Sequence, residues 1–227
     1  MKKFSVGIAA VIAVLVIFSE VVIPLVMSSA AQSQLRKMTH SDNLTVSLGS
    51  VPGLLMLAGK VNRVEIKANE AYLGDVRVND TELHGEDVTV NVERFIQGKG
   101  FQIDEARHID FFGTVTANSL EELINKKVDK LNVESLEITP ETIKIKAKAA
   151  VLGKDLKVDF AGDVYSNGNK LYLRAQQVSV KGVSVKSRIA TRIFGDILLY
   201  DFDGLKFPVK LQTVEQQSGT IHMTFTN

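Results

Sequence analysis

The chain has 227 residues, of which 45% are apolar and 23% are charged, and this is the composition of a globular protein and not of a disordered one. It has no cysteine, which excludes disulfides, thiolate zinc sites and cysteine nucleophiles. Taking Lys2, Lys3 and Glu20 away from the totals of 27 basic and 26 acidic residues leaves 25 of each for residues 28–227, and a neutral domain of this kind argues against nucleic acid as a partner.

The N-terminal segment predicts export. Lys2 and Lys3 precede a long apolar stretch in which Glu20 is the only charged residue, and positive charges before such a stretch keep the N-terminus on the cytoplasmic side. Small residues at 28–31 offer a site for signal peptidase. Residues 1–27 are therefore expected to be a signal peptide or an uncleaved N-terminal membrane anchor. The protein is expected in the cell envelope, either anchored or released.

The residues after the apolar stretch predict that one helix continues from the membrane into the domain. Residues 28–38 are good helix formers, with no breaker before the polar cluster at 39–43. Pro24 is expected to kink this helix or to mark the end of its lipid-embedded part.

Beyond this helix, apolar residues occupy every second position, which is typical of antiparallel strands with one buried and one solvated face. The clearest alternations are at 63–68, 87–92, 143–151, 156–160 and 221–225. Turns are predicted at Asn167-Gly168, where both residues tolerate positive φ, and at 139–142 and 152–155. The strands are expected to form a long antiparallel meander in a single domain over residues 28–227.

Two amphipathic helices are predicted to interrupt the meander. Ser119 and Glu122 have the spacing of a capping box, which opens a helix with Leu123 on its apolar face. The second helix is predicted over 186–200. Its apolar stripe is formed by Ile189, Ile193, Phe194, Ile197 and Leu198.

The sequence does not decide what two short apolar segments pack against. Leu54–Ala58 lies between glycines and is too short to cross a bilayer, which needs about 20 residues. It is therefore buried in its own domain, in a membrane surface or against an apolar ligand. Phe111 and Phe112 are adjacent, so on a strand one ring faces inward and the other is available to a bilayer surface.

No arrangement of reactive residues predicts an enzyme. The four histidines lack the i, i+4 spacing of metal ligands on a helix, and no nucleophile elbow or phosphate-binding glycine loop is present in the sequence. Asp201–Gly204 begins like a calcium loop but lacks the later ligands, so a turn is favoured. No enzymatic activity, metal or cofactor is expected.

The predicted strands carry more apolar surface than two short helices can cover. Either the sheet curls and fills its interior with its own side chains, or it leaves an apolar trough, and the composition favours neither. A trough lined by aliphatic side chains would suit acyl chains.

Four segments, spaced in order along nearly the whole chain, are similar to those of a known family. They are the anchor with Pro24, GSVPGLLMLAGKVNRVEI at 49–66, TANSLEELINKKV at 116–128 and DGLKFPVKL at 203–211. Together they resemble the LmeA-like family of bacterial cell-envelope phospholipid-binding proteins. The resemblance implies an α+β fold related to the tubular lipid-binding (TULIP) superfamily, in which a strongly bent antiparallel sheet of long strands wraps around a long helix. The two short amphipathic helices would be additions to that fold.

The resemblance implies binding of phospholipid acyl chains in an apolar groove, at the membrane, in envelope lipid trafficking or maintenance. It also implies that residues 54–57 form a buried turn that plugs one end of the wrapped sheet, touching lipid tails or only the core. The residues expected to bind lipid are Leu54, Leu55, Leu57, Phe112, Leu123, Ile189, Ile193, Phe194 and Ile197. The alternative function is a structural envelope protein that binds a protein partner through a sheet edge.

Overall fold

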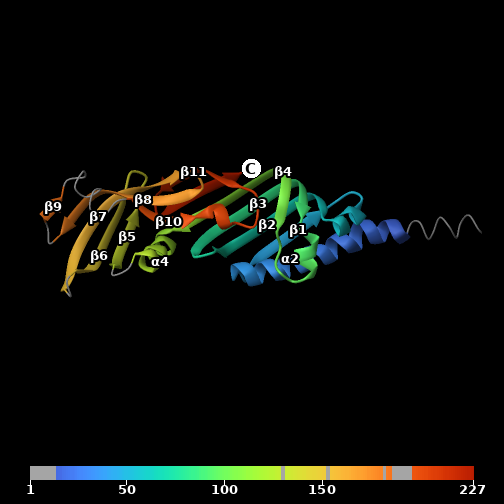
Figure 1. The fold of residues 1–227 in the computed structure, drawn as a ribbon, viewed down its shortest axis with the longest axis horizontal. Coiled ribbons are helices and arrows are strands. Elements are labelled where there is room, and N and C mark those ends of the chain that lie inside the picture. Colours follow the sequence, from blue (N-terminus) through green and yellow to red (C-terminus); the bar gives the residue numbers. More distant parts are fainter. Residues whose placement is uncertain (1–13, 129–130, 152–153, 181–182, 186–195) are drawn as a thin grey trace, which may run out of the picture.

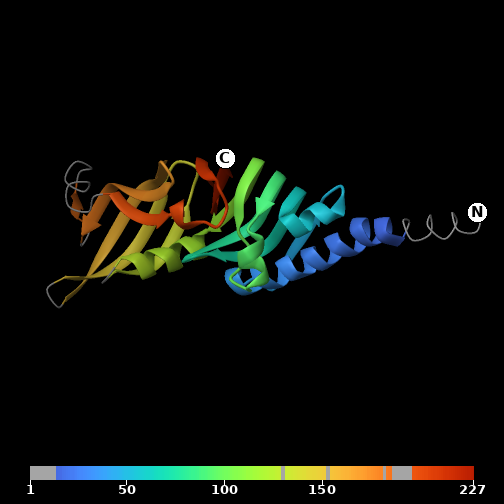
Figure 2. The ribbon, with the colours of Figure 1, turned by 45° about the vertical axis from the view of Figure 1, so that its right-hand side comes forward.

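In a computed structural model the chain forms two antiparallel sheets that lie end to end, with one long helix beside the first of them (Figures 1 and 2). The structure describes residues 14–128, 131–151, 154–180, 183–185 and 196–227. The α+β class and the antiparallel pairing of the strands are confirmed within these ranges.

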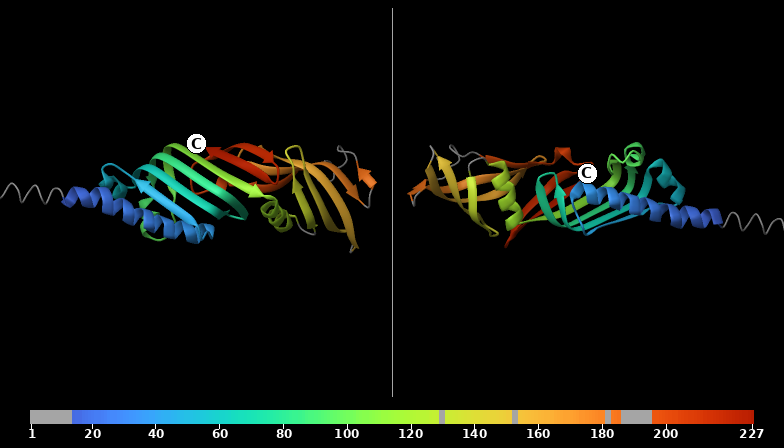
Figure 3. Two further views of the ribbon diagram at one scale, coloured as in Figure 1. Left: turned by 180° about the vertical axis from the view of Figure 1, so that it is seen from behind. Right: turned by 90° about the horizontal axis from the view of Figure 1, so that it is seen from below.

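The first sheet contains six antiparallel strands in the order β1-β2-β3-β4-β12-β11 and curls into a half-barrel (Figure 3). Its strands are β1 (Leu44–Gly49), β2 (Lys60–Leu73), β3 (Val76–Val90), β4 (Ile103–Thr116), β11 (Lys210–Gln217) and β12 (Thr220–Thr226). The predicted apolar face of the last strand is confirmed, because Ile221, Met223 and Phe225 are all buried.

The second sheet has the order β10-β8-β7-β6-β5, and β9 pairs with β8. Its strands are β5 (Leu131–Ile138), β6 (Ile143–Val151), β7 (Lys154–Asn167), β8 (Lys170–Val180), β9 (Val183–Val185) and β10 (Asp196–Asp201). The prediction of one continuous sheet is therefore wrong. The C-terminal hairpin β11–β12 pairs with β4 and occupies the edge on which β5 would have continued the meander.

One helix runs from Val14 to Thr39, as the sequence predicts. It contains a π-helical turn, η1 (Phe18–Val22), followed by α2 (Ile23–Thr39). Pro24 lies directly after the irregular turn, where its missing N–H prevents a regular helical hydrogen bond. The helix ends at His40, whose left-handed φ of 49° turns the chain back into β1.

Side chains of α2 bind the free edge of β1. The Ser28 hydroxyl accepts a hydrogen bond from the Leu48 amide at 2.9 Å, and the Arg36 guanidinium donates to the Leu44 carbonyl at 3.0 Å. An exposed edge strand invites pairing with another chain. The helix therefore satisfies backbone groups that would otherwise be open to strand addition.

Within the described ranges four short helices join the strands, and α4 begins earlier than the sequence predicts. They are η2 (Gly53–Ala58), α3 (Val92–Ile96), α4 (Ala117–Lys127) and η3 (Phe202–Gly204). The hydroxyl of Thr116 at the end of β4 accepts a hydrogen bond from the Ser119 amide at 3.2 Å. Thr116 is thus the N-cap, and the capping box predicted at Ser119 is wrong.

The helix predicted over 186–200 is wrong at its C-terminal end. Residues 196–201 form β10, which pairs antiparallel with β8, and residues 186–195 lie outside the described ranges. Leu199 is fully buried whereas its neighbour Leu198 is 43% exposed, as expected for the alternating faces of a strand. Periodicity does not separate a short apolar strand from a helix, and the pairing with β8 decides between them.

A continuous set of buried side chains extends through both sheets. Where the sheets meet, the ring of Phe202 packs edge-on against those of Tyr200 and Phe225, with centroids 4.8 and 4.9 Å away. The Asn169 side chain, in the turn between β7 and β8, accepts a hydrogen bond from the Leu211 amide at 2.9 Å. Aromatic packing and backbone hydrogen bonds therefore join the two sheets.

Candidate functional site

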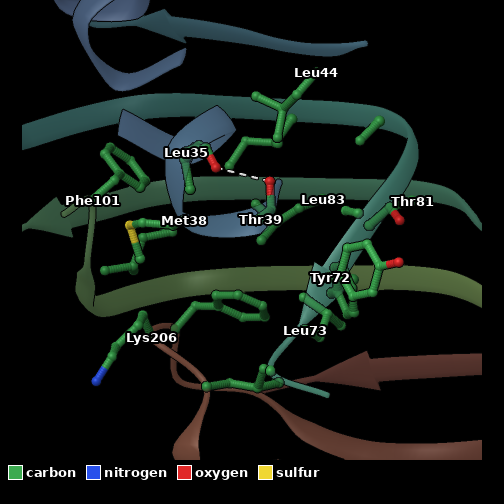
Figure 4. A pocket seen from close by; sticks show the side chains of 18 of the residues that line it. Leu35, Met38, Thr39, Leu44, Tyr72, Leu73, Thr81, Leu83, Phe101 and Lys206 are labelled. Atoms are coloured by element: carbon green, nitrogen blue, oxygen red, sulfur yellow. Dashed lines mark hydrogen bonds between the residues drawn. The ribbon is translucent and has the colours of Figure 1, made fainter. Parts of the chain in front are cut away.

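An apolar pocket of about 290 Å³ lies between the last turns of α2 and the inner face of the first sheet. The segment 204–207, which begins with the last residue of η3, closes it on the remaining side. Figure 4 shows side chains from several elements converging on this space, among them Leu35, Met38, Leu44, Leu73, Leu83 and Phe101.

The pocket is formed where small residues of β2 face the helix. Ala68 and Ala71 are both buried and both line the pocket. Leu35 and Met38 reach it from one face of α2, because residues three apart lie on the same side of a helix. A larger side chain at either alanine would fill space that α2 and the neighbouring strands leave open.

Few polar groups reach this pocket. The Thr81 hydroxyl is buried in its wall, and no described residue forms a hydrogen bond with it. The Thr39 hydroxyl donates to the Leu35 carbonyl at 2.8 Å and is thereby satisfied (Figure 4). Burial raises the pKa of the Tyr200 phenol, with smaller contributions from nearby carboxylates, so this hydroxyl stays neutral at physiological pH.

Lys206 is the one charged residue among those lining the pocket. Its side chain is exposed, and its amino group points away from the apolar side chains (Figure 4). The charge therefore lies at the rim of the pocket and not inside it.

A second, more polar hollow of about 620 Å³ adjoins the pocket. The two share Ile103 and the segment 204–207 as a common wall. The polar residues lining the second hollow are Gln102, Asp104, Asn169, Asp203, Lys206, Lys210 and Asn227. An apolar pocket beside a polar hollow offers complementary surfaces to a molecule with an apolar tail and a polar head.

The buried turn predicted at residues 54–57 is wrong. Leu54, Leu55 and Leu57 are 56%, 40% and 57% exposed, and only Met56 is buried. They lie on η2, where the short 3₁₀-helix turns a single side chain toward the core. None of the three lines the pocket.

The other predicted lipid-binding residues lie elsewhere in the fold. Phe112 is 40% exposed on β4, whereas the adjacent Phe111 is buried and lines the pocket, so the prediction that one ring faces inward is confirmed. Leu123 is buried on α4, and Ile197 is partly buried on β10. The remaining three lie outside the described ranges: Ile189, Ile193 and Phe194.

The described residues contain no cluster of three or more histidine, aspartate or glutamate side chains able to hold a metal ion. The Asp75 carboxylate accepts hydrogen bonds from Lys126 and Lys127, which lower its pKa to about 2. This contact ties the turn between β2 and β3 to α4, next to Gly74, which lines the pocket.

Comparison with known proteins identifies a family. A family model described as LmeA-like phospholipid-binding matches residues 19–226. No curated protein and no solved structure matches the chain. By length and composition, the helix Val14–Thr39 is able to cross a membrane, and 17% of its most apolar window is buried in the structure.

Proposed function

Because the chain belongs to the LmeA-like phospholipid-binding family, we propose that it binds phospholipid by taking an acyl chain into the pocket between α2 and the first sheet. The observation that carries this proposal is the pocket, whose walls are apolar and whose one lining charge, Lys206, lies at the rim. Lipid trafficking or maintenance in a bacterial envelope is the role proposed for this binding.

The size of the pocket limits how much of a lipid enters it. Ligand pockets have volumes of roughly 300–1,000 Å³, and this one, at about 290 Å³, is at the lower end. It holds part of one tail. Burying six methylenes contributes roughly 5 kcal/mol at about 0.8 kcal/mol each, before the cost of association is subtracted.

The polar hollow beside the pocket is proposed to receive the headgroup. Its shared wall, 204–207, allows one molecule to occupy both spaces. Lys206 lines both, and Lys210 lies in the polar hollow, so two ammonium groups are available to a phosphate. Charge-assisted contacts of this kind are stronger than those between neutral groups. The two carboxylates of the hollow, Asp104 and Asp203, accept hydrogen bonds from the side chains of Gln102 and Asn169.

We propose that the N-terminal span is retained as an anchor. The small residues at 28–31 that suggest cleavage lie inside α2, where Ala31 is fully buried and the Ser28 hydroxyl binds the Leu48 amide. Cleavage there would remove part of the cover of β1. The folded domain is therefore continuous with the helix that leads to the membrane.

Photo-crosslinking tests the pocket. The full chain is reconstituted in bilayer discs containing a phospholipid with a diazirine at its tail, and labelled peptides are mapped by mass spectrometry. Label is expected on the pocket strands and on α2. Ala68→Leu should lower it about fiftyfold, because its three added carbons fill the space of three methylenes and remove roughly 2.4 kcal/mol of binding.

The matched control is Ala147→Leu. Ala147 is buried on β6 of the second sheet and does not line the pocket, so this variant makes the same insertion elsewhere and should keep full labelling. Equal labelling in Ala68→Leu and the unmodified chain, or labelling confined to the apolar span, would contradict the proposal.

The edge strand β1 does not support the alternative function, in which a protein partner pairs with a sheet edge. Edge pairing needs free backbone donors and acceptors, and there Ser28 and Arg36 of α2 already bind the backbone of Leu48 and Leu44. A protein partner that binds the lipid-free chain as tightly as the loaded one would favour this alternative.

A further inference from the structure

Four exposed apolar side chains gather between β1 and β2, and we call them the apolar tip. Val51, Leu54, Leu55 and Leu57 are 80%, 56%, 40% and 57% exposed. All four lie on η2 or within two residues of its start. Large apolar side chains in water are unfavourable, and a contiguous group of them marks a surface that contacts another apolar phase.

The apolar tip is fixed against the apolar part of the N-terminal helix. The Gly53 amide donates a hydrogen bond to the Glu20 carboxylate at 3.1 Å. A Cβ at Gly53 would lie 1.7 Å from the Ser19 carbonyl oxygen, so the two backbones are in direct contact. Met56 of η2 and Ile23 of the helix are both buried, and η2 packs against this part of the helix.

Glu20 is the one charged residue of the apolar stretch, and the structure accounts for it. Its carboxylate also accepts a hydrogen bond from the Ser19 hydroxyl at 3.2 Å. A charged group in a membrane normally faces protein and pairs with polar partners there. The amide of Gly53 supplies such a partner, which places η2 at the depth of Glu20.

The helix surface around this contact is also apolar. Around the contact, Phe18, Val21 and Leu25 of the helix are each more than half exposed. Met27 is the last residue of the apolar stretch, and Glu20 lies seven residues before it. At about 1.5 Å per residue, the contact is roughly 10 Å inside the apolar end of the helix.

We propose that the apolar tip is embedded among the acyl chains of the outer leaflet of the membrane that the helix spans. The proposal rests on the retained anchor proposed above. The helix holds the tip below the level at which the apolar stretch ends, so a spanning helix carries the tip into the leaflet with it. Lys60 follows the tip and is exposed. Its ammonium donates a hydrogen bond to the Thr89 hydroxyl at 2.8 Å, and its flexible stem allows the ammonium to turn from there to the headgroups.

Depth-dependent quenching tests this placement. The chain contains no tryptophan, so one introduced tryptophan reports only its own surroundings. Full-length Leu54→Trp, Leu25→Trp and Leu198→Trp are reconstituted in phosphatidylglycerol–phosphatidylcholine vesicles whose acyl chains carry bromine. Leu25 on α2 reports the span, and Leu198 on β10 is an exposed leucine of the distant second sheet.

The Leu54→Trp emission is expected to shift to the blue and to be quenched as strongly as that of Leu25→Trp, with Leu198→Trp unquenched. Leu57→Trp should repeat the result if Leu54→Trp does not fold. If the emission of Leu25→Trp is quenched and that of Leu54→Trp is not, the proposal is overturned and the anchor still stands. If neither emission is quenched, the anchor is overturned as well. A blue shift without quenching overturns it in favour of contact with a second copy of the chain.

Discussion

At the scale of single residues, Gly53 has the strictest packing requirement in the contact between helix and tip. Its backbone lies so close to Ser19 that no side chain fits between them, and its amide satisfies Glu20. Glycine is needed here for close approach and not for a special φ. A glycine between apolar residues gave no indication from sequence alone that its partner lay 33 residues earlier.

Gly53→Ala is expected to destabilise the protein by about 1–3 kcal/mol, because the added methyl forces η2 away from the helix. Thermal unfolding of the full chain in detergent measures this as a lower Tm. Gly49→Ala is the control, since a Cβ at Gly49 would meet no atom within 4 Å. Equal Tm values for both variants would show that the close contact does not form.

At the scale of elements, the strands were more predictable than the helices. Alternation placed β6 at its observed residues, 143–151, and Asn167-Gly168 marked the turn between β7 and β8, where Gly168 has φ of 58°. The pocket was not predictable from local pattern. It depends on Ala68 of β2 lining the same space as Leu35 and Met38 of α2, although β1 and η2 separate these elements along the chain. Small residues on a strand signal a cavity only once their neighbours are known.

The start of α4 gives a test that separates the cap seen in the structure from the one expected from sequence. Thr116→Ala should cost about 1 kcal/mol, because the hydroxyl that accepts the Ser119 amide is lost. Thr116→Ser keeps the oxygen and should restore most of the stability. Glu122, which a capping box would require, instead pairs with Arg77 at 2.9 Å. Because a surface ion pair contributes little, Glu122→Ala should lower the Tm less than Thr116→Ala does. A larger loss in Glu122→Ala than in Thr116→Ala would favour the sequence-based cap, in which the Glu122 side chain binds a backbone amide.

At the scale of the whole molecule, one helix connects the proposed membrane contact to the pocket. Leu35 and Met38 lie 8 and 11 residues beyond Met27 on the same helix, which corresponds to roughly 12–16 Å at about 1.5 Å per residue. With the apolar tip in the leaflet, the pocket stands above the membrane surface. A lipid bound there has left the bilayer at least in part, which fits extraction or transfer better than storage within the leaflet.

Because the helix is continuous with the domain, shortening the helix is expected to lower the stability of the domain. A chain beginning at residue 32 loses Ser28 and Glu20, which bind the amides of Leu48 and Gly53, together with the buried side chains of Ile23 and Ala31. Losing two hydrogen bonds and two buried side chains should cost roughly 4–7 kcal/mol. The amides of β1 should then exchange with deuterium faster than those of β6, which the helix does not touch. A chain beginning at Ser19 keeps all four residues and serves as the control in the same detergent. If the two truncated chains unfold at the same temperature and protect β1 equally, α2 does not stabilise the domain through these residues, and retention of the span would need another explanation.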